Sequence, residues 1–162
     1  MQSDDLELLA ENLGAQCLLN GYQLVIAESC TGGMICSAIT QISGCSQWFT
    51  QGFITYSNQS KIDLLGVSED SLTRYGAVSQ QVANEMACGA VQRSQGSLSL
   101  SITGIAGPSG GTITKPVGTV FFSVCDKKKL LLEHKAHFEG TRKEIREKGL
   151  LFALNSLLKL TL

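Results

Sequence analysis

The chain has 162 residues, of which 43% are hydrophobic, enough for one domain with its own core. It carries 13 basic and 14 acidic residues and a net charge of −1, which excludes the strong positive field typical of nucleic-acid-binding proteins. We therefore expect a single domain over residues 1–162 that binds no nucleic acid.

The sequence contains no segment typical of membrane insertion or secretion. No apolar run approaches the roughly 20 residues needed to span a bilayer. The stretch 1–5, Met-Gln-Ser-Asp-Asp, is acidic, whereas a secretory signal begins with basic residues. We expect a cytoplasmic protein without membrane contact.

The cysteines and histidines show no spacing typical of a metal site. None of the six cysteines forms a C-x-x-C pair, and the two histidines lie far from them in the sequence. His134 and His137 fall on opposite faces of a predicted strand, which argues against one shared site. We expect buried free thiols, and neither a metal nor a cofactor.

The first predicted elements are a helix, a strand and a second helix. Apolar residues at helical spacing over 6–17 predict a helix that ends at Gly21. The apolar run 24–27 predicts a short buried strand. It stops at the small, polar cluster 28–33, Glu-Ser-Cys-Thr-Gly-Gly, and a second helix is expected over about 31–42.

The middle of the chain predicts two strands and two capped helices. Aromatic and β-branched residues over 48–56 are typical of a strand. Ser68 and Ser79 are expected to cap a short and a longer helix. Strict alternation over 98–103 predicts a strand, and one of its faces carries only hydroxyl groups, so a helix can approach closely there.

The last third predicts a hairpin and a terminal helix. Strands are expected over 117–124 and 130–138, joined by the lysine-rich turn 127–129. Thr141 and Glu144 have the spacing of a capping box at the start of the last helix. Helices before, between and after the strands predict an α/β fold with helices on both faces of the sheet, and the late hairpin makes that sheet mixed.

Ser29 stands at a strand-to-helix turn, where hydroxyl and backbone N–H groups point at a bound ligand. Glu28 and Thr31 are polar groups that need partners or a ligand at such a place. Gly32 and Gly33 each cost about 1 kcal/mol in a helix relative to alanine, which close approach of a ligand would justify. An ordinary helix cap, with glycines that permit close packing, explains the segment equally well.

The segment 56–61, Tyr-Ser-Asn-Gln-Ser-Lys, supplies a possible base. A serine paired with a lysine performs acyl transfer without histidine. Burial lowers the pKa of a lysine from about 10.4 toward neutrality, so that Lys61 is able to accept the proton of Ser29.

Two further features indicate an anion. The glycine-rich stretch 103–112 directly follows a predicted strand and offers backbone N–H groups to a phosphate or an oxyanion, although a flexible surface loop is the alternative. Arg142 lies in the first turn of a predicted helix, where a cation is unfavourable unless an anion is near. Pairing with Glu139 or Glu144 on a solvated face would also explain Arg142.

Five segments, in order along the chain, resemble the CinA C-terminal domain family, whose stand-alone members are nicotinamide-nucleotide amidases. They are 27–33 (AESCTGG), 52–58 (GFITYSN) together with Lys61, 76–79 (GAVS), 103–108 (TGIAGP) and 115–120 (KPVGTV). The likeness spans nearly the whole chain, and a first helix with no preceding domain resembles the stand-alone form.

The resemblance implies a three-layer α/β/α sandwich that hydrolyses the carboxamide of nicotinamide mononucleotide to nicotinate mononucleotide and ammonia. Its partner is then a small-molecule nucleotide substrate. By motif match it implies Ser29 as the nucleophile, with Lys61 and Tyr56 as activating partners. The substrate contacts that it implies are Glu28, Thr31, Gly32, Gly33, Asn58, Thr103, Gly104 and Arg142.

Two other functions stay open. The chain would be a non-catalytic nucleotide-binding module if it kept the fold without turnover, but binding alone does not need a serine–lysine pair. It would be a thiol-dependent hydrolase if Cys30 were the nucleophile, although Cys30 is better explained as a small residue packed at a helix start. The apolar composition and short edge strands are compatible with a homodimer.

Overall fold

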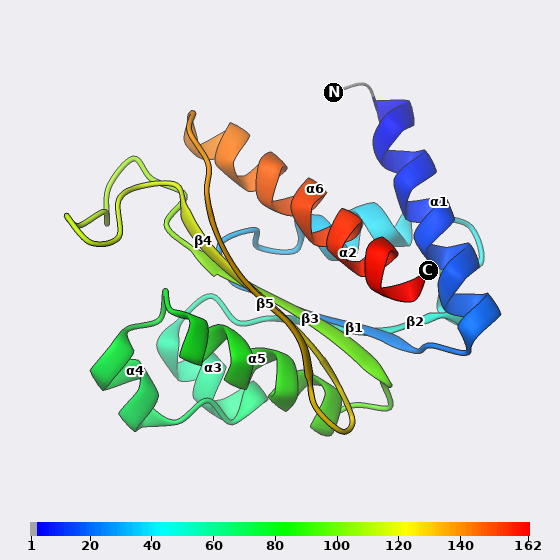
Figure 1. Ribbon diagram of the computed structural model, residues 1–162, viewed down its shortest axis with the longest axis horizontal. Helices are drawn as coiled ribbons and strands as arrows, with labels where there is room; N and C mark the ends of the chain where they lie inside the picture. Colours follow the sequence, from blue (N-terminus) through cyan, green and yellow to red (C-terminus); the bar gives the residue numbers. More distant parts are fainter. Residues whose placement is uncertain (1–2) are drawn as a thin grey trace.

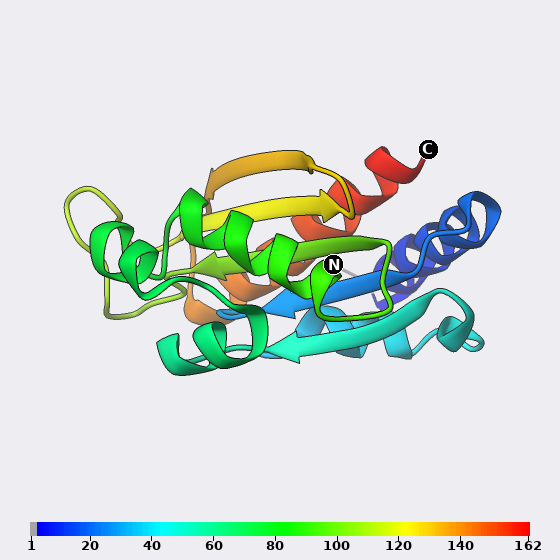
Figure 2. The ribbon, with the colours of Figure 1, turned by 90° about the horizontal axis from the view of Figure 1, so that it is seen from below.

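The computed structural model describes residues 3–162, so Met1 and Gln2 of the acidic N-terminal stretch lie outside the described residues. Five strands form one sheet in the order β2-β1-β3-β4-β5, with β2 and β5 at its two edges (Figure 2). β1 pairs in parallel with β2 and β3, whereas β4 pairs antiparallel with β3 and β5, which confirms the mixed sheet. The strands are β1 (Leu24–Glu28), β2 (Phe49–Ile54), β3 (Leu98–Gly104), β4 (Thr119–Asp126) and β5 (Leu130–His137).

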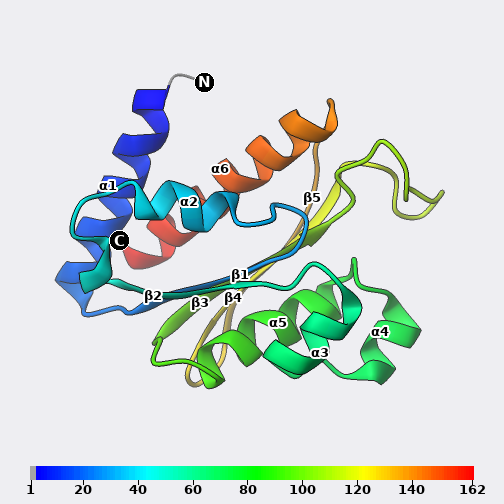
Figure 3. The same cartoon turned by 180° about the vertical axis from the view of Figure 1, so that it is seen from behind.

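Helices cover both faces of the sheet, as Figure 1 and, from behind, Figure 3 show. One face carries α1 (Ser3–Asn20), α2 (Met34–Thr40) and α6 (Arg142–Thr161). The other carries α3 (Asn58–Leu65), α4 (Glu69–Tyr75) and α5 (Gln80–Gln92), and a short 3-10 helix (Cys45–Gln47) precedes β2. The predicted three-layer α/β/α sandwich is confirmed.

Alternate residues of β1 belong to two different hydrophobic clusters, one on each face of the sheet. On β1, Leu24 and Ile26 belong to the larger cluster, which also contains residues of α1, α2 and α6, while Val25 and Ala27 belong to the smaller one with residues of α5. Every residue of β1 is buried. The strand that leads to Ser29 is therefore held rigidly from both sides.

The hydroxyl face of β3 receives α5 as predicted. Ser99 Oγ donates a hydrogen bond to the carbonyl of Ala87 at 2.7 Å, and Ser101 Oγ donates to the carbonyl of Ala83 at 2.6 Å. Because these hydroxyls are satisfied by helix carbonyls, α5 packs directly on the sheet. α5 also lies so close to α3 that a Cβ on Gly89 would overlap a backbone carbonyl of α3.

The predicted start of α2 is wrong by three residues. Gly32 and Gly33 have φ angles of +60° and +99°, which a right-handed helix does not contain, and α2 begins only at Met34. It also ends at Thr40, short of the expected position 42.

The three predicted caps at Ser68, Ser79 and Thr141 are confirmed. Ser68 and Ser79 accept hydrogen bonds from backbone N–H groups three residues on, and the capping box of Thr141 and Glu144 is present. None of the helices in residues 3–162 has both the length and the apolar character that spanning a membrane requires.

Candidate active site

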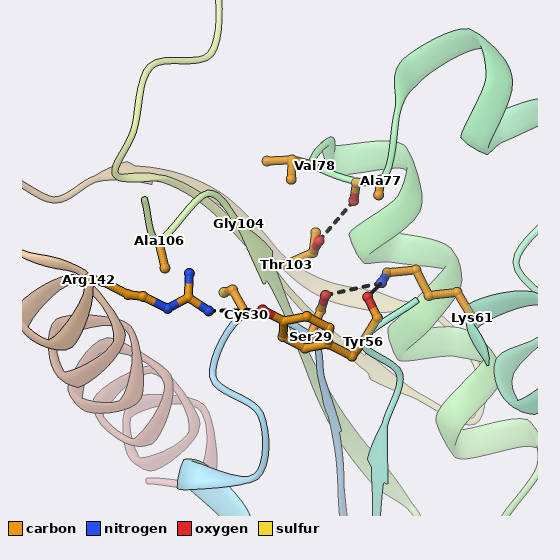
Figure 4. Close-up of a pocket in the computed structure, with 10 residues that line it drawn as sticks. All are labelled: Ser29, Cys30, Tyr56, Lys61, Ala77, Val78, Thr103, Gly104, Ala106 and Arg142. Atoms are coloured by element: carbon orange, nitrogen blue, oxygen red, sulfur yellow. Dashed lines mark hydrogen bonds between the residues drawn. The ribbon is translucent and has the colours of Figure 1, made fainter. Parts of the chain in front are cut away.

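A pocket of about 210 Å³ lies beside the carboxyl ends of the parallel strands β1 and β3 (Figure 4). This edge of an open α/β sheet is where ligands ordinarily bind. Six of the predicted site residues line it, from four separate parts of the chain: Ser29, Tyr56, Lys61, Thr103, Gly104 and Arg142. The remaining lining residues are Cys30, Ala77, Val78 and Ala106.

Ser29 and Lys61 are in direct contact inside this pocket. The Nζ atom of Lys61 donates a hydrogen bond to Ser29 Oγ at 3.0 Å (Figure 4). It also donates to the carbonyl oxygens of Thr55 at 2.7 Å and Tyr56 at 3.4 Å. Lys61 is only 1% exposed and Ser29 only 8%. The two carbonyl oxygens thus fix the amine beside the Ser29 hydroxyl.

Burial lowers the pKa of Lys61 from 10.5 to about 8, because the ammonium loses its water; the nearby Cys30 opposes the shift. Among residues 3–162, no carboxylate forms an ion pair with Lys61 that would restore the charged form. A substantial fraction of Lys61 is therefore neutral near pH 8 and is able to accept a proton.

Ser29 is held by the end of the sheet and by the turn that follows. Its backbone N–H donates to the carbonyl of Ile102 on β3 at 3.0 Å, and its own carbonyl accepts from the Gly32 N–H at 3.1 Å. The positive φ angles of Gly32 and Gly33 then reverse the chain into α2. The side chain of Ser29 consequently leaves the sheet at its open edge.

Glu28, which the resemblance implies as a substrate contact, does not line the pocket in this structure. Its fully buried carboxylate accepts hydrogen bonds from the backbone N–H groups of Gly33 at 2.9 Å, Ile35 at 3.2 Å and Cys36 at 2.8 Å. These N–H groups belong to the start of α2, whose dipole also favours a negative charge. Glu28 therefore stabilises the turn instead of facing a ligand.

Four further predicted contacts also lie outside the pocket lining. Thr31 is completely buried, and within residues 3–162 its hydroxyl has no hydrogen-bond partner. Gly32 and Gly33 form the turn between β1 and α2, and both have the positive φ angles that glycine adopts readily. Asn58 is exposed at the first position of α3. The structure brings none of these four to the pocket wall.

Arg142 and Tyr56 meet at the mouth of the pocket. One guanidinium nitrogen, Nη1, donates to the Gly107 carbonyl at 2.8 Å, and the other, Nη2, donates to the Tyr56 hydroxyl at 2.9 Å (Figure 4). The side chain of Tyr56, which is 60% exposed, contacts Arg142 through its hydroxyl. Lys61 is contacted only by the backbone carbonyl of Tyr56. The alternative pairing of Arg142 with a glutamate is absent from residues 3–162.

Three apolar lining residues were missed by the sequence analysis: Ala77, Val78 and Ala106. The first two precede α5, and the Ala77 carbonyl accepts a hydrogen bond from Thr103 Oγ1 at 2.9 Å. All three lie within the segments GAVS and TGIAGP, so the motif match was the signal that pointed to them.

Cys30 lines the pocket as a buried thiol. Burial raises its pKa to about 12, with a smaller contribution from the charge of Glu28. The sulfur is therefore protonated at neutral pH, and a protonated thiol is a poor nucleophile. This favours the interpretation of Cys30 as a packed small residue over a thiol-dependent hydrolase.

Comparison with known proteins gives consistent matches over almost the whole chain. The family described as CinA C-terminal domain matches residues 6–161. "Nicotinamide-nucleotide amidohydrolase PncC" of Enterobacter agglomerans is 45% identical over 98% of this chain and 97% of its own length, and the protein of that name from Escherichia coli K12 is 41% identical over 97% and 95%. The crystal structure of competence/damage inducible protein CihA from Agrobacterium tumefaciens superposes with a TM-score of 0.93 at 41% identity, covering 98% of this chain and 96% of that one.

Proposed function

The chain belongs to the CinA C-terminal domain family, and from this premise we propose that it hydrolyses the carboxamide of nicotinamide mononucleotide, releasing ammonia and nicotinate mononucleotide. The observation that carries the proposal is the buried hydrogen bond between Lys61 Nζ and Ser29 Oγ in the pocket. The names of the two amidohydrolase relatives support the choice of substrate.

Ser29 and Lys61 carry out the proposed reaction in two stages. Neutral Lys61 takes the proton of Ser29 as Oγ attacks the carboxamide carbon, and then passes this proton to the amine that leaves as ammonia. A water molecule next attacks the resulting ester, again giving its proton to Lys61. The ester bond breaks as Lys61 returns this proton to Ser29 Oγ. The carboxylic acid product gives its own proton to solvent and leaves as nicotinate mononucleotide. The lowered pKa of Lys61 supports this use as a base.

Backbone N–H groups around Ser29 are suited to the oxyanion of the tetrahedral intermediate. Within residues 3–162, the N–H groups of Cys30 and Ala106 donate to no oxygen, and both residues line the pocket. Donors of this kind contribute about 10²- to 10³-fold each to kcat in acyl-transfer enzymes. We assign the Cys30 N–H as the first donor because it directly follows the nucleophile.

The remaining lining residues suit the two ends of the nucleotide. The apolar side chains of Ala77, Val78 and Ala106 offer a surface for a planar pyridine ring. The guanidinium of Arg142, at the mouth, has the fork geometry that binds a phosphate through two hydrogen bonds. In this assignment Tyr56 orients Lys61 through its carbonyl and contributes its hydroxyl to the phosphate end.

Ammonia release tests the proposal, with free nicotinamide and the unphosphorylated riboside as parallel substrates. We expect release from the mononucleotide alone, because Arg142 then reads the phosphate. If the folded protein releases ammonia from none of the three, the proposed hydrolysis is contradicted. The alternative is then a non-catalytic nucleotide-binding module, which calorimetry tests by measuring binding of the mononucleotide.

A further inference from the structure

Two charged side chains, Glu28 and Arg146, bind the backbone of the turn after Ser29. Glu28 accepts hydrogen bonds from three backbone N–H groups at the end of the turn and the start of α2. Arg146, on α6, donates from Nε to the Cys30 carbonyl at 3.1 Å and from Nη2 to the Thr31 carbonyl at 2.7 Å. The carboxylate thus takes the donors of this segment, and the guanidinium takes its acceptors.

Arg146 has no other partner that explains its position. It is half-buried against the turn, and among residues 3–162 it forms no ion pair with a carboxylate. The proposed reaction does not use Arg146, and Arg146 does not line the pocket. Its two hydrogen bonds go only to the peptide units that follow the nucleophile, so its effect is on their orientation.

The orientation of the Ser29 and Cys30 carbonyls fixes the orientation of the N–H groups of Cys30 and Thr31. In a trans peptide unit the N–H points opposite to the C=O. The Cys30 carbonyl is bound by Arg146, so the Thr31 N–H points away from the guanidinium. The Ser29 carbonyl is bound by the Gly32 N–H, so the Cys30 N–H points away from the turn interior.

Neither of these two N–H groups is used by the fold. Within residues 3–162, the N–H groups of Cys30 and Thr31 donate to no oxygen, whereas the N–H groups of Ser29, Gly32 and Gly33 each have an acceptor on Glu28 or on the backbone. A backbone donor that is held in place and left without an acceptor is available to a ligand.

We propose that Arg146 is a positioning residue that fixes the peptide units after Ser29 and so presents the Cys30 N–H to the oxyanion. This inference rests on the proposed function. Without the guanidinium, the Cys30–Thr31 and Thr31–Gly32 peptide units are free to rotate. The Gly32 N–H then no longer holds the Ser29 carbonyl, so the Ser29–Cys30 unit that carries the donor must be reoriented each time the oxyanion forms. The ground-state substrate is uncharged at this oxygen, so its binding changes little.

Replacement of Arg146 by methionine and by lysine tests this. We expect kcat of Arg146→Met to fall about 10- to 100-fold with KM within about twofold, and Arg146→Lys to recover part of the loss because an amine still donates to a carbonyl. Lys143→Met is the matched control, since it removes a positive charge from the same helix at an exposed position that does not touch the turn. It should keep its kcat.

Two measurements separate positioning from general damage. Added methylguanidinium should restore part of the kcat of Arg146→Ala, and in a Ser29→Ala background the Arg146→Met change should leave the Kd for nicotinamide mononucleotide within about twofold. The proposal is overturned by folded Arg146→Met with unchanged kcat, or by losses of kcat and of affinity that are equal.

An amide NMR comparison without substrate keeps the inference separate from the proposed activity. If Arg146 orients the turn, Arg146→Met should change the backbone amide shifts of residues 29–33 most, and Lys143→Met should not. A wild-type protein that hydrolyses no nucleotide would contradict the proposed function alone. Unchanged shifts over 29–33 in Arg146→Met would contradict the positioning role, whatever the activity.

Discussion

The amine of Lys61 lies 3.0 Å from the hydroxyl of Ser29 in the interior of the protein, although 32 positions separate the two residues in the sequence. Lys61 comes from α3 and Ser29 from the end of β1, on a sheet that buries both. Two backbone carbonyls hold the amine in this position and no carboxylate neutralises it among residues 3–162. Such an amine loses its proton readily. The hydrolysis rate and the stability of the protein should therefore depend on pH.

The hydrolysis rate should rise with pH and level off above about pH 8. Because burial lowers the pKa of Lys61 to about 8, the amine is protonated below that value and cannot accept the proton of Ser29. Ammonia release measured as kcat/KM from pH 6 to pH 10 should follow one ionisation near that value. A rate that falls as the pH rises over this range would exclude Lys61 as the base.

The same pKa shift predicts how stability depends on pH. The unfolded chain holds the Lys61 proton up to pH 10.5, whereas the folded protein releases it at about pH 8. Between these values the unfolded state binds more protons, so stability rises with pH. Below about pH 8 both states are protonated, and burial of the charge costs about 3 kcal/mol.

Lys61→Met isolates this contribution, because other titrations cancel in the difference between the two proteins. From about pH 7 to about pH 10.5, the unfolding free energy of the wild type should rise by about 3 kcal/mol relative to the variant, as measured by urea denaturation. A difference that stays constant, or that shrinks as the pH rises, would show that Lys61 is not desolvated in the folded protein.

Cys30 should be dispensable for hydrolysis. Its pKa is raised to about 12, so it is a protonated thiol at neutral pH, and its side chain serves only to fill the pocket wall. Cys30→Ser should retain kcat within about tenfold, because the backbone N–H that we assign to the oxyanion remains. Iodoacetamide at pH 7 should leave the wild-type rate unchanged; loss of activity that follows alkylation of Cys30 would support the thiol-dependent alternative instead.

Arg142→Met should weaken recognition of the phosphate and little else. Removing a bidentate, charge-assisted contact is expected to raise the KM for nicotinamide mononucleotide by about 10- to 100-fold. The kcat at saturating substrate should change little, because the phosphate lies at the other end of the nucleotide from the carboxamide that reacts. Lys143→Met, the neighbouring exposed cation, is the control. Equal effects of the two substitutions would indicate a diffuse electrostatic contribution and contradict the assigned contact.

Much of the fold was predictable because it depends on local pattern. The alternating serines of β3 predicted that a helix packs closely on that face. α5 does so, and its carbonyls accept hydrogen bonds from Ser99 and Ser101. The capping box at Thr141 likewise appears as predicted. By contrast, α3 was missed because it is short and its buried positions are Lys61 and Leu65, so it has no apolar stripe to reveal it.

The residues of the site were predictable from the sequence, but the directions in which their side chains point were not. The sequence places Glu28 next to Ser29, yet the side chains point apart: the carboxylate turns to the start of α2, and the hydroxyl turns to Lys61. Adjacent residues of a strand face opposite sides of a sheet, and here the turn adds a further rotation. The contact of Arg142 with Tyr56 joins α6 to the segment before α3, which no local pattern encodes.

The most direct test of the account is to measure hydrolysis and binding of nicotinamide mononucleotide by Ser29→Ala on the same sample. We expect ammonia release to fall to background while the Kd stays close to that of the wild type, because the pocket and Arg142 are intact. Ammonia release that persists in folded Ser29→Ala would show that Ser29 is not the nucleophile.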